Sequence, residues 1–235
     1  MSTNKFQVII ADPPFGFSDK LSMSDVARGA TSNYSTMSIS DIKALPVKDI
    51  ADPNGAVLAL WVPSSLLSDG LDIMKSWGFT QKQTYIWVKT KKEPLKDLNS
   101  AIFKSIKAKD ANILISKVKS GLKLLFDDFN FNDILAFGMG RLFRQTHEIC
   151  LIGTNNNGIY KILEDKSQRS VCCEINQGHS IKPNNLHESL ELMFPTAKNK
   201  LELFARRTRS GWLCLGNESP QSLGLDIRDC LEKLK

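Results

Sequence analysis

The amino-acid sequence predicts an α/β fold with a largely parallel central sheet. Six short apolar runs have the length and composition of buried strands, and amphipathic helical patterns separate some of them. Buried strands that alternate with helices are typical of sheets whose neighbouring strands run parallel.

Each predicted element has local support. In chain order, the predicted strands are Phe6–Ala11, Ala56–Val62, Thr84–Lys89, His147–Ile152, Lys200–Phe204 and Trp212–Leu215. Apolar residues at helical spacing predict helices over Ser64–Trp77 and Pro183–Phe194. Gly78 follows the first helix as a C-cap, and Pro183 suits the first turn of the second.

Two segments do not follow this alternation. Gly16–Ser40 is rich in Ser, Thr, Asp and Gly, and is interpreted as a long loop of the kind that is functional or disordered. Lys91–Phe137 holds a lysine-rich stretch with apolar residues near helical spacing, which predicts a basic helical insertion. A solvated surface and a nucleic-acid contact explain that basic stretch about equally well. We expect one domain over residues 1–235 that carries the insertion at about 91–137.

Composition is that of an ordinary globular protein. The 235 residues carry a formal net charge of +6, which favours polyanionic partners mildly. The five cysteines show no C-x-x-C spacing and the three histidines are far apart, so no metal site is expected. No apolar stretch is long enough to span a bilayer, and the N-terminus does not resemble a signal peptide. We therefore expect a cytoplasmic protein without membrane contact, or one in host cytoplasm if a phage encodes it.

The stretch ADPPF follows the first predicted strand directly. Asp12 would lie at the carboxyl end of that strand, where open α/β sheets bind ligands. Pro13 and Pro14 stiffen the chain and have no N–H group, so carbonyl oxygens and the carboxylate form a set of acceptors without competing donors. Such a set suits an exocyclic amino group, and Phe15 offers a ring on which a base can stack. A plain turn explains the tetrapeptide alone equally well.

A series of motifs resembles the MT-A70 family of adenine-N6 methyltransferases, especially its short phage and bacterial members. In order they are VIIADPPF, NYSTMS, LALWVPS, WGF, YIWVKT, GMGRLFRQTHEICLIG, HSIKPNN, KLELFARR and GWLCLGNE. The resemblance implies S-adenosylmethionine as methyl donor and a Rossmann-like fold. It also implies that Asp12, Pro13, Pro14 and Phe15 form the catalytic motif, with Asp12 also near the cofactor.

Further roles follow from the resemblance alone. It implies that Lys182, Arg206, Asn217 and Glu218 bind the cofactor. Tyr34 matches a tyrosine in a loop that covers the site. Arg141 and Arg144 are expected to meet nucleic-acid phosphates or a partner subunit.

One departure from the family concerns the cofactor's adenine. The Asp-Ile pair that holds it lies upstream of the catalytic motif in the eukaryotic mRNA enzyme, whereas this chain has Asp226 and Ile227 near its other end. We infer a circular permutation, and expect a strand carrying this pair to lie beside the N-terminal strand. An ordinary C-terminal strand-to-helix turn is the alternative.

The expected reaction is direct methyl transfer to adenine N6, with Asp12 and the Pro13 carbonyl holding the amino group. DNA is favoured as acceptor because the chain is short, and RNA is the alternative. A non-catalytic nucleic-acid-binding subunit and a methyltransferase for a small amine or protein side chain are the competing functions. A homodimer, or pairing with a related subunit, is expected from the family.

Overall fold

A computed structural model describes residues 5–16, 36–93, 131–138, 140, 142–176 and 181–235. The chain divides into two compact units, the first formed by residues 1–86, 148–170 and 184–235, and the second by 87–147 and 171–183. The prediction of a single domain stays a prediction, and the basic helical insertion falls mostly outside the described residues.

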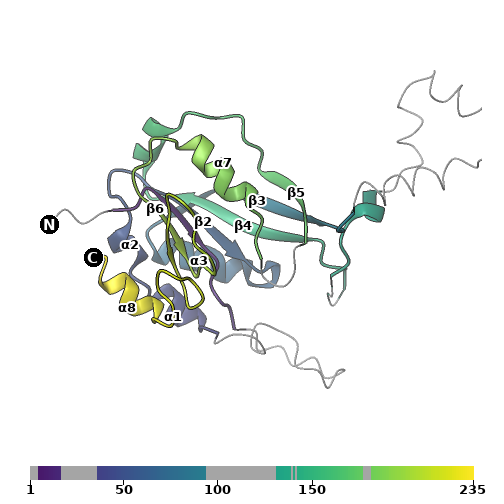
Figure 1. Ribbon diagram of the computed structural model, residues 1–235, viewed down its shortest axis with the longest axis horizontal. Coiled ribbons are helices and arrows are strands. Elements are labelled where there is room, and N and C mark those ends of the chain that lie inside the picture. The colour runs from purple at the N-terminus through teal and green to yellow at the C-terminus, as the bar shows by residue number, and fades with distance from the viewer. Residues whose placement is uncertain (1–4, 17–35, 94–130, 139, 141, 177–180) are drawn as a thin grey trace, which may run out of the picture. The chain divides into compact units, whose positions relative to one another are not determined.

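A seven-stranded mixed sheet forms the framework (Figure 1), in the order β5-β3-β4-β2-β1-β6-β7. The strands are β1 Val8–Ala11, β2 Val57–Val62, β3 Thr80–Thr90, β4 His147–Thr154, β5 Val171–Ile175, β6 Lys200–Leu203 and β7 Leu213–Leu215. β1 pairs in parallel with β2 and β6, and β6 with β7, whereas β4 runs antiparallel to β2. The predicted α/β class with a mostly parallel sheet is therefore confirmed.

All six predicted strands exist, within a few residues of their predicted ends. Strand β5 was not predicted, because only one of its side chains is buried and its sequence is not an apolar run. The helices are α1 Ile39–Lys43, α2 Val47–Ile50, α3 Leu67–Ser76, α7 Asn185–Met193 and α8 Ile227–Glu232. Single 3₁₀ segments occupy Ser64–Leu66, Phe131–Ile134 and Asn157–Ile162. Gly78 ends α3 as predicted, with a φ of 82° that favours glycine.

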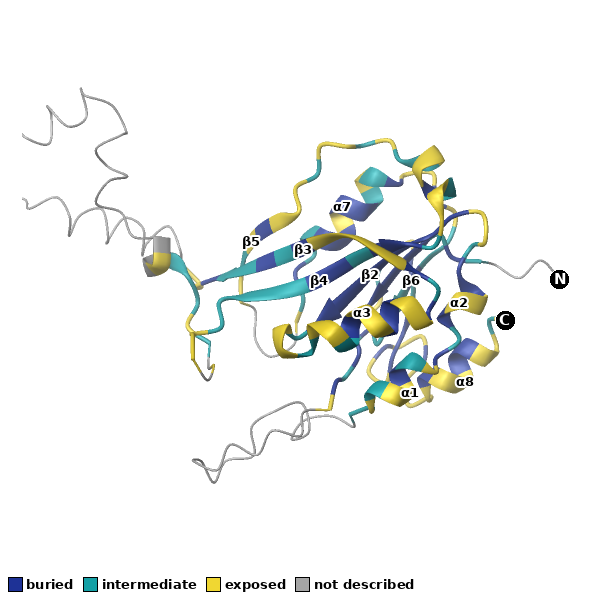
Figure 2. Ribbon diagram, turned by 180° about the vertical axis from the view of Figure 1, so that it is seen from behind, coloured by how far each residue is buried: buried dark blue, intermediate teal, exposed yellow. Residues whose placement is uncertain are grey.

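Helices cover both faces of the first unit's strands (Figures 1 and 2). The largest apolar core lies on one face, where α1, α2, α3 and α8 meet the alternate residues Ile9, Ala11, Leu58, Leu60, Leu201 and Leu203. Trp77 is fully buried there and its indole Nε1–H donates to the Ile42 carbonyl over 2.9 Å, which joins α3 to α1. Helix α7 lies on the opposite face.

The two ends of the described chain meet in the first unit. Lys5 Nζ donates to the Lys235 carbonyl over 3.3 Å, so the segment that leads into β1 lies beside the end of α8.

Candidate active site

Three parallel strands bring the predicted site residues of the first unit to one edge of the sheet. In the pairing register Ala11 lies beside Leu203, and Leu203 lies beside Leu215, so β1, β6 and β7 end together. The loop after each of these strands carries residues that were predicted to form the site, beginning with Asp12 after β1. This edge is where open α/β sheets bind ligands.

The backbone of the D-P-P-F segment is held at both ends. The Asp12 N–H donates to the Leu203 carbonyl over 3.4 Å, which ties the half-buried Asp12 to the end of β6. The Phe15 N–H donates to the Pro13 carbonyl over 2.9 Å, and the Met37 N–H donates to the Pro14 carbonyl over 2.9 Å. The expectation that these carbonyls have no competing donors is therefore wrong. Each carbonyl keeps a second lone pair with which it can accept from a ligand.

Phe15 is packed into the protein. Its side chain is 3% exposed and belongs to the apolar core, with Met37 packed beside that core. A base can stack on this ring only if the ring becomes more exposed on binding. The predicted stacking role of Phe15 stays a prediction.

The loops after β6 and β7 run against one another. The Ala205 N–H donates to the Leu215 carbonyl over 2.9 Å, and a Cβ on Gly216 would overlap the Ala205 carbonyl oxygen. This close approach puts Arg206, which follows Ala205, beside the loop that carries Asn217 and Glu218. Arg206 is half-buried, whereas both loop residues are exposed.

Phe204 connects β6 to this loop in an unusual conformation. Its φ is 64°, in the left-handed region that a bulky residue rarely adopts. Backbone strain of this kind concentrates at functional sites when the surroundings enforce it. Phe204 turns the chain sharply at the end of β6, directly before Ala205 and Arg206.

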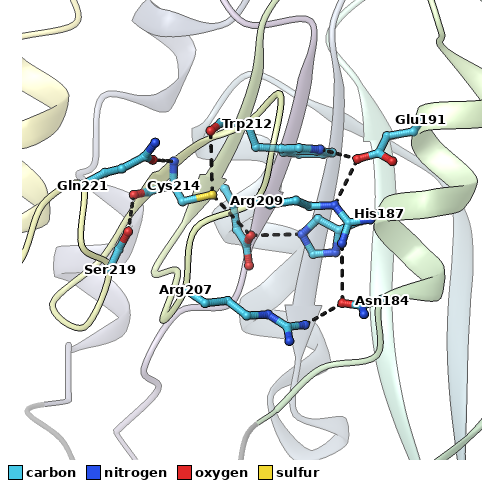
Figure 3. A network of polar contacts seen from close by, with 10 residues as sticks. Asn184, His187, Glu191, Arg207, Arg209, Trp212, Cys214, Ser219 and Gln221 are labelled. Carbon is cyan, nitrogen blue, oxygen red and sulfur yellow. Dashed lines mark hydrogen bonds and ion pairs between the residues drawn. The ribbon is translucent and has the colours of Figure 1, made fainter.

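A polar network that the sequence did not predict lies between α7 and the last two strands (Figure 3). Glu202, inside β6, places Oε2 at 3.0 Å from His187 Nε2 on α7, and the His187 ring packs edge-on against Trp212 with centroids 5.0 Å apart. On the same helix, Glu191 Oε1 accepts from the Trp212 indole over 2.6 Å and from Arg209 Nε over 3.0 Å. The available signal was an acidic residue at an alternate position of an apolar strand, KLELF.

Two groups of this network have shifted pKa values. Burial alone would raise the pKa of Glu191, but hydrogen bonds from Arg209 and Trp212 outweigh it, and the pKa lies below its ordinary value. Burial, helped by the charge of Glu202, raises the pKa of Cys214 to about 11. The Cys214 thiol is therefore protonated at neutral pH and is not a nucleophile.

The loop between β6 and β7, which carries part of this network, is arginine-rich. Arg207 Nη2 donates to the Asn184 side-chain oxygen over 2.6 Å, and Arg209 Nη1 reaches the same oxygen at 3.5 Å (Figure 3). Asn184 directly precedes α7, so these contacts fix the start of that helix against the loop after β6. The half-buried Arg206 is thereby carried on a loop that is anchored on both sides.

Asp226 and Ile227 begin helix α8 and are not part of a strand, so the expected strand beside β1 is wrong. The Asp226 side chain caps the helix by accepting from the Arg228 N–H over 2.8 Å, and it also pairs with the Arg228 guanidinium over 2.6 Å. Ile227 is buried in the apolar core. An Asp followed by a helical pattern makes an N-cap, which explains the local structure. Contact with the cofactor's adenine and the circular permutation stay predictions.

The remaining predicted residues lie elsewhere. Lys182 and Arg144 belong to the second unit, where Lys182 is half-buried and Arg144 is exposed. Tyr34 and Arg141 lie outside the described residues. In the part of the chain that the structure describes, no three His, Cys, Asp or Glu side chains are grouped as for a metal ion. Among those same residues, no helix is both long and apolar enough to cross a membrane.

Comparisons with known proteins find relatives among methyltransferases. A 25% identical relative, an N(6)-adenosine-methyltransferase MT-A70-like protein of Arabidopsis thaliana, matches 91% of this chain and 24% of its own length. The N(6)-adenosine-methyltransferase catalytic subunit of Homo sapiens is 23% identical over 91% of this chain and 28% of its own length. The type II methyltransferase M.MunI of Mycoplasma sp. is 24% identical over 93% of this chain and 79% of its own length.

Thus the chain spans about a quarter of the adenosine methyltransferases that it matches, and most of the type II methyltransferase. The model of the MT-A70 family matches residues 6–132 and 129–218, which include β1, the D-P-P-F segment and the starts of the loops after β6 and β7. This chain belongs to the MT-A70 family.

Proposed function

We propose that this chain is an S-adenosylmethionine-dependent methyltransferase that methylates the N6 amino group of adenine in nucleic acid, with DNA as the favoured acceptor. The observation that carries the proposal is the position of Asp12. The motif D-P-P-F follows the central strand β1 at the sheet edge where the loops of Arg206 and Asn217 meet. Membership of the MT-A70 family supports the same chemistry.

The side chains at this edge suit the proposed cofactor. Asp12, Glu218 and Asn217 offer oxygen acceptors for ribose hydroxyls and for a cationic group, and Arg206 offers donors. The close approach of the backbones at Ala205 and Gly216 leaves no room for a larger residue at 216 and fixes the two loops together. We propose Lys182 as a partner of the cofactor's carboxylate, and Asp226 with Ile227 as contacts of its adenine.

The protein's part in the reaction follows from the acceptors of the catalytic motif. S-adenosylmethionine supplies a methyl group on a positively charged sulfur. Asp12 Oδ and the second lone pair of the Pro13 carbonyl each accept a hydrogen bond from one of the two N–H groups of the target amine. These contacts draw the nitrogen lone pair out of conjugation with the ring and stabilise the positive charge that develops on nitrogen. Holding the amine in line with the methyl group supplies much of the remaining rate increase.

The relatives differ in how much of their own length this chain covers. The chain covers 79% of the type II methyltransferase, against about a quarter of the proteins whose names specify adenosine. RNA is the alternative acceptor, because the adenosine methyltransferases match 91% of this chain.

The deciding experiment supplies methyl-tritiated S-adenosylmethionine with single-stranded DNA, duplex DNA and RNA of matched sequence. We expect label at adenine N6 in duplex DNA, and none with Asp12→Ala, which should lose at least about 100-fold in rate. Label in RNA alone would replace DNA by RNA as the acceptor. Cofactor binding without label in any polymer would contradict an activity of the isolated chain and favour a partner-dependent or non-catalytic subunit.

A further inference from the structure

A short hairpin in the second unit precedes β4. Its arms pair at Gly138 and Gln145, where the Gln145 N–H donates to the Gly138 carbonyl over 3.2 Å. A Cβ on Gly138 would overlap the Gln145 carbonyl oxygen, and one on Gly140 would overlap the Phe143 carbonyl oxygen. Glycine at both positions therefore lets the arms approach and makes the turn narrow.

Backbone hydrogen bonds anchor the base of this hairpin to β3. The Ala136 N–H donates to the Lys89 carbonyl over 2.8 Å, and the Lys89 N–H donates to the Thr146 carbonyl over 2.8 Å. Both arms thus bond to a single residue of β3. The base of the hairpin is therefore fixed to β3.

The tip displays large apolar side chains to solvent. Leu142 is 93% exposed, Phe143 86% and Phe137 73%, whereas the other exposed large apolar residues of the described chain do not exceed 70%. Apolar side chains at this exposure contribute nothing to folding stability, because they remain in water in the folded state. Their concentration on one narrow turn points to a binding role.

The surroundings of the tip are cationic. The sequence from Ala136 to His147 contains two arginines and no acidic residue. The Arg144 guanidinium lies 4.7 Å from the centre of the Phe137 ring, so a positive charge is held directly beside the apolar tip. A partner that accepts both features must offer apolar surface between negative charges.

We propose that this hairpin is a wedge that inserts Leu142 and Phe143 between stacked base pairs of duplex DNA, while Arg144 faces a backbone phosphate. This inference rests on the proposed function, and it adds the element that would open the base stack. Enzymes that modify a base inside a duplex must first take it out of the stack. Leucine and phenylalanine are among the side chains that proteins insert for this purpose.

Duplex DNA fits the tip better than a protein surface does. A stable protein interface buries about 800 Å² on each partner, and it needs many more contacts than two adjacent side chains supply. A gap between base pairs, in contrast, accepts one or two apolar side chains and is flanked by phosphates. The alternation of apolar and cationic groups on the hairpin matches that geometry.

The test compares Leu142→Ser/Phe143→Ser with wild type and with Leu192→Ser, which removes a half-exposed leucine on α7. The probe is a pool of DNA duplexes of randomised sequence, each with one 2-aminopurine, whose fluorescence rises when the base leaves the stack. We expect wild type and Leu192→Ser to raise the fluorescence and the double variant not to. We also expect the double variant to lose about 10-fold in affinity for the duplex, the scale of one lost stacking contact, and under about 2-fold for single strands.

A second variant, Phe143→Trp, keeps a flat ring at the tip and should retain the fluorescence rise. A wild-type protein that leaves the fluorescence unchanged would overturn the wedge, as would equal affinity losses for duplex and single strands. A dimer of the wild type that the double variant dissociates, with unchanged DNA affinity, would assign the tip to a protein interface instead. Because the fluorescence needs no methyl transfer, failure of the proposed activity and failure of the wedge give different results.

Discussion

Two carboxylates on neighbouring strands have different surroundings. Asp12 lies one residue beyond the end of β1, where its backbone is tied to β6 and the D-P-P-F segment begins. Glu202 lies inside β6, opposite Ile10 of β1, and contacts His187 on the covering helix α7. The acid inside the sheet joins a helix to a strand, whereas the acid at the sheet edge lies where ligands bind. The two acids are of the same chemical kind, and their positions along the strand set their different surroundings.

Asp226 extends the comparison to a second motif match. Asp226, like Asp12, was expected to contact the cofactor because the residues around it resemble a motif of the family. The structure shows that Asp226 caps α8 and pairs with Arg228. The expected place of Asp12 at the end of a strand was therefore correct, whereas the strand expected at Asp226 is the start of a helix.

The largest effect should come from Asp12→Asn, which keeps the shape of the side chain and removes its charge. Loss of a negative acceptor beside the nitrogen that becomes positive should lower the single-turnover rate about 100-fold. The midpoint of thermal unfolding is measured in the same variant, so that a loss of rate is separated from a loss of fold. Asp72→Asn, on the solvent side of α3, is the control of equal charge change. A rate within threefold of wild type would remove Asp12 from the catalytic motif.

The next effect is on stability and belongs to α7. Glu191→Ala leaves the buried Trp212 indole and the Arg209 guanidinium without their shared acceptor, which should cost about 2 kcal/mol of unfolding free energy. Urea denaturation at pH 7 measures this cost. Glu188→Ala, exposed on the same helix, should change stability by less than about 1 kcal/mol. Equal costs at both positions would show that the network adds nothing beyond the helix itself.

Much of the fold was predictable because buried strands have a strong signal. The six apolar runs became strands, and Asp12 fell at the sheet edge because it follows one of them. β5 was missed because only one of its five residues is buried, so it lacks an apolar run. Helix α8 was not predicted because Asp226 and Ile227 were compared only with the family's Asp-Ile pair. The residues that form the helix, IRDCLE, were not tested for a helical pattern.

The network on α7 could not be derived from sequence in the same way. His187 and Glu202, for example, are 15 residues apart in the sequence, and they meet only after α7 has packed on the sheet. A single Glu in a buried strand indicates that a partner exists, but not which one. The close approach of Ala205 and Gly216 is similarly a product of the final strand order.

A smaller stability effect distinguishes the two possible roles of Asp226. Asp226→Ala removes the cap of α8 and should cost about 1 kcal/mol, measured by urea denaturation. Asp226→Asn keeps a side-chain oxygen at the cap and should restore most of that loss. The affinity for S-adenosylmethionine is then measured in the Asn variant, which is not confounded by unfolding. Weakened binding would give this carboxylate the cofactor contact expected from sequence, and unchanged binding would leave it as a cap alone.

The smallest effect is the pH dependence of the same carboxylate. Side-chain hydrogen bonds from Arg228, followed by its backbone N–H, lower the pKa of Asp226 from its ordinary value of 3.8 to about 2. A carboxyl whose pKa is lower in the folded state adds stability above its unfolded pKa and loses it as the pH falls through the folded value. The side chain is 40% exposed, so solvent screening keeps the contribution under about 1 kcal/mol.

The stability difference between wild type and Asp226→Asn should therefore be constant above about pH 5, since Asn caps a helix as well as Asp but cannot pair with Arg228. It should shrink as the pH falls below about 5 and vanish only below the folded pKa of about 2. At neutral pH, 1 M salt should reduce the same difference, because the charges are near the surface. A difference that persists unchanged at pH 2 would mean that the Arg228 pair is not its source. Asp226 would then stabilise α8 through the shape of its cap and not through its charge.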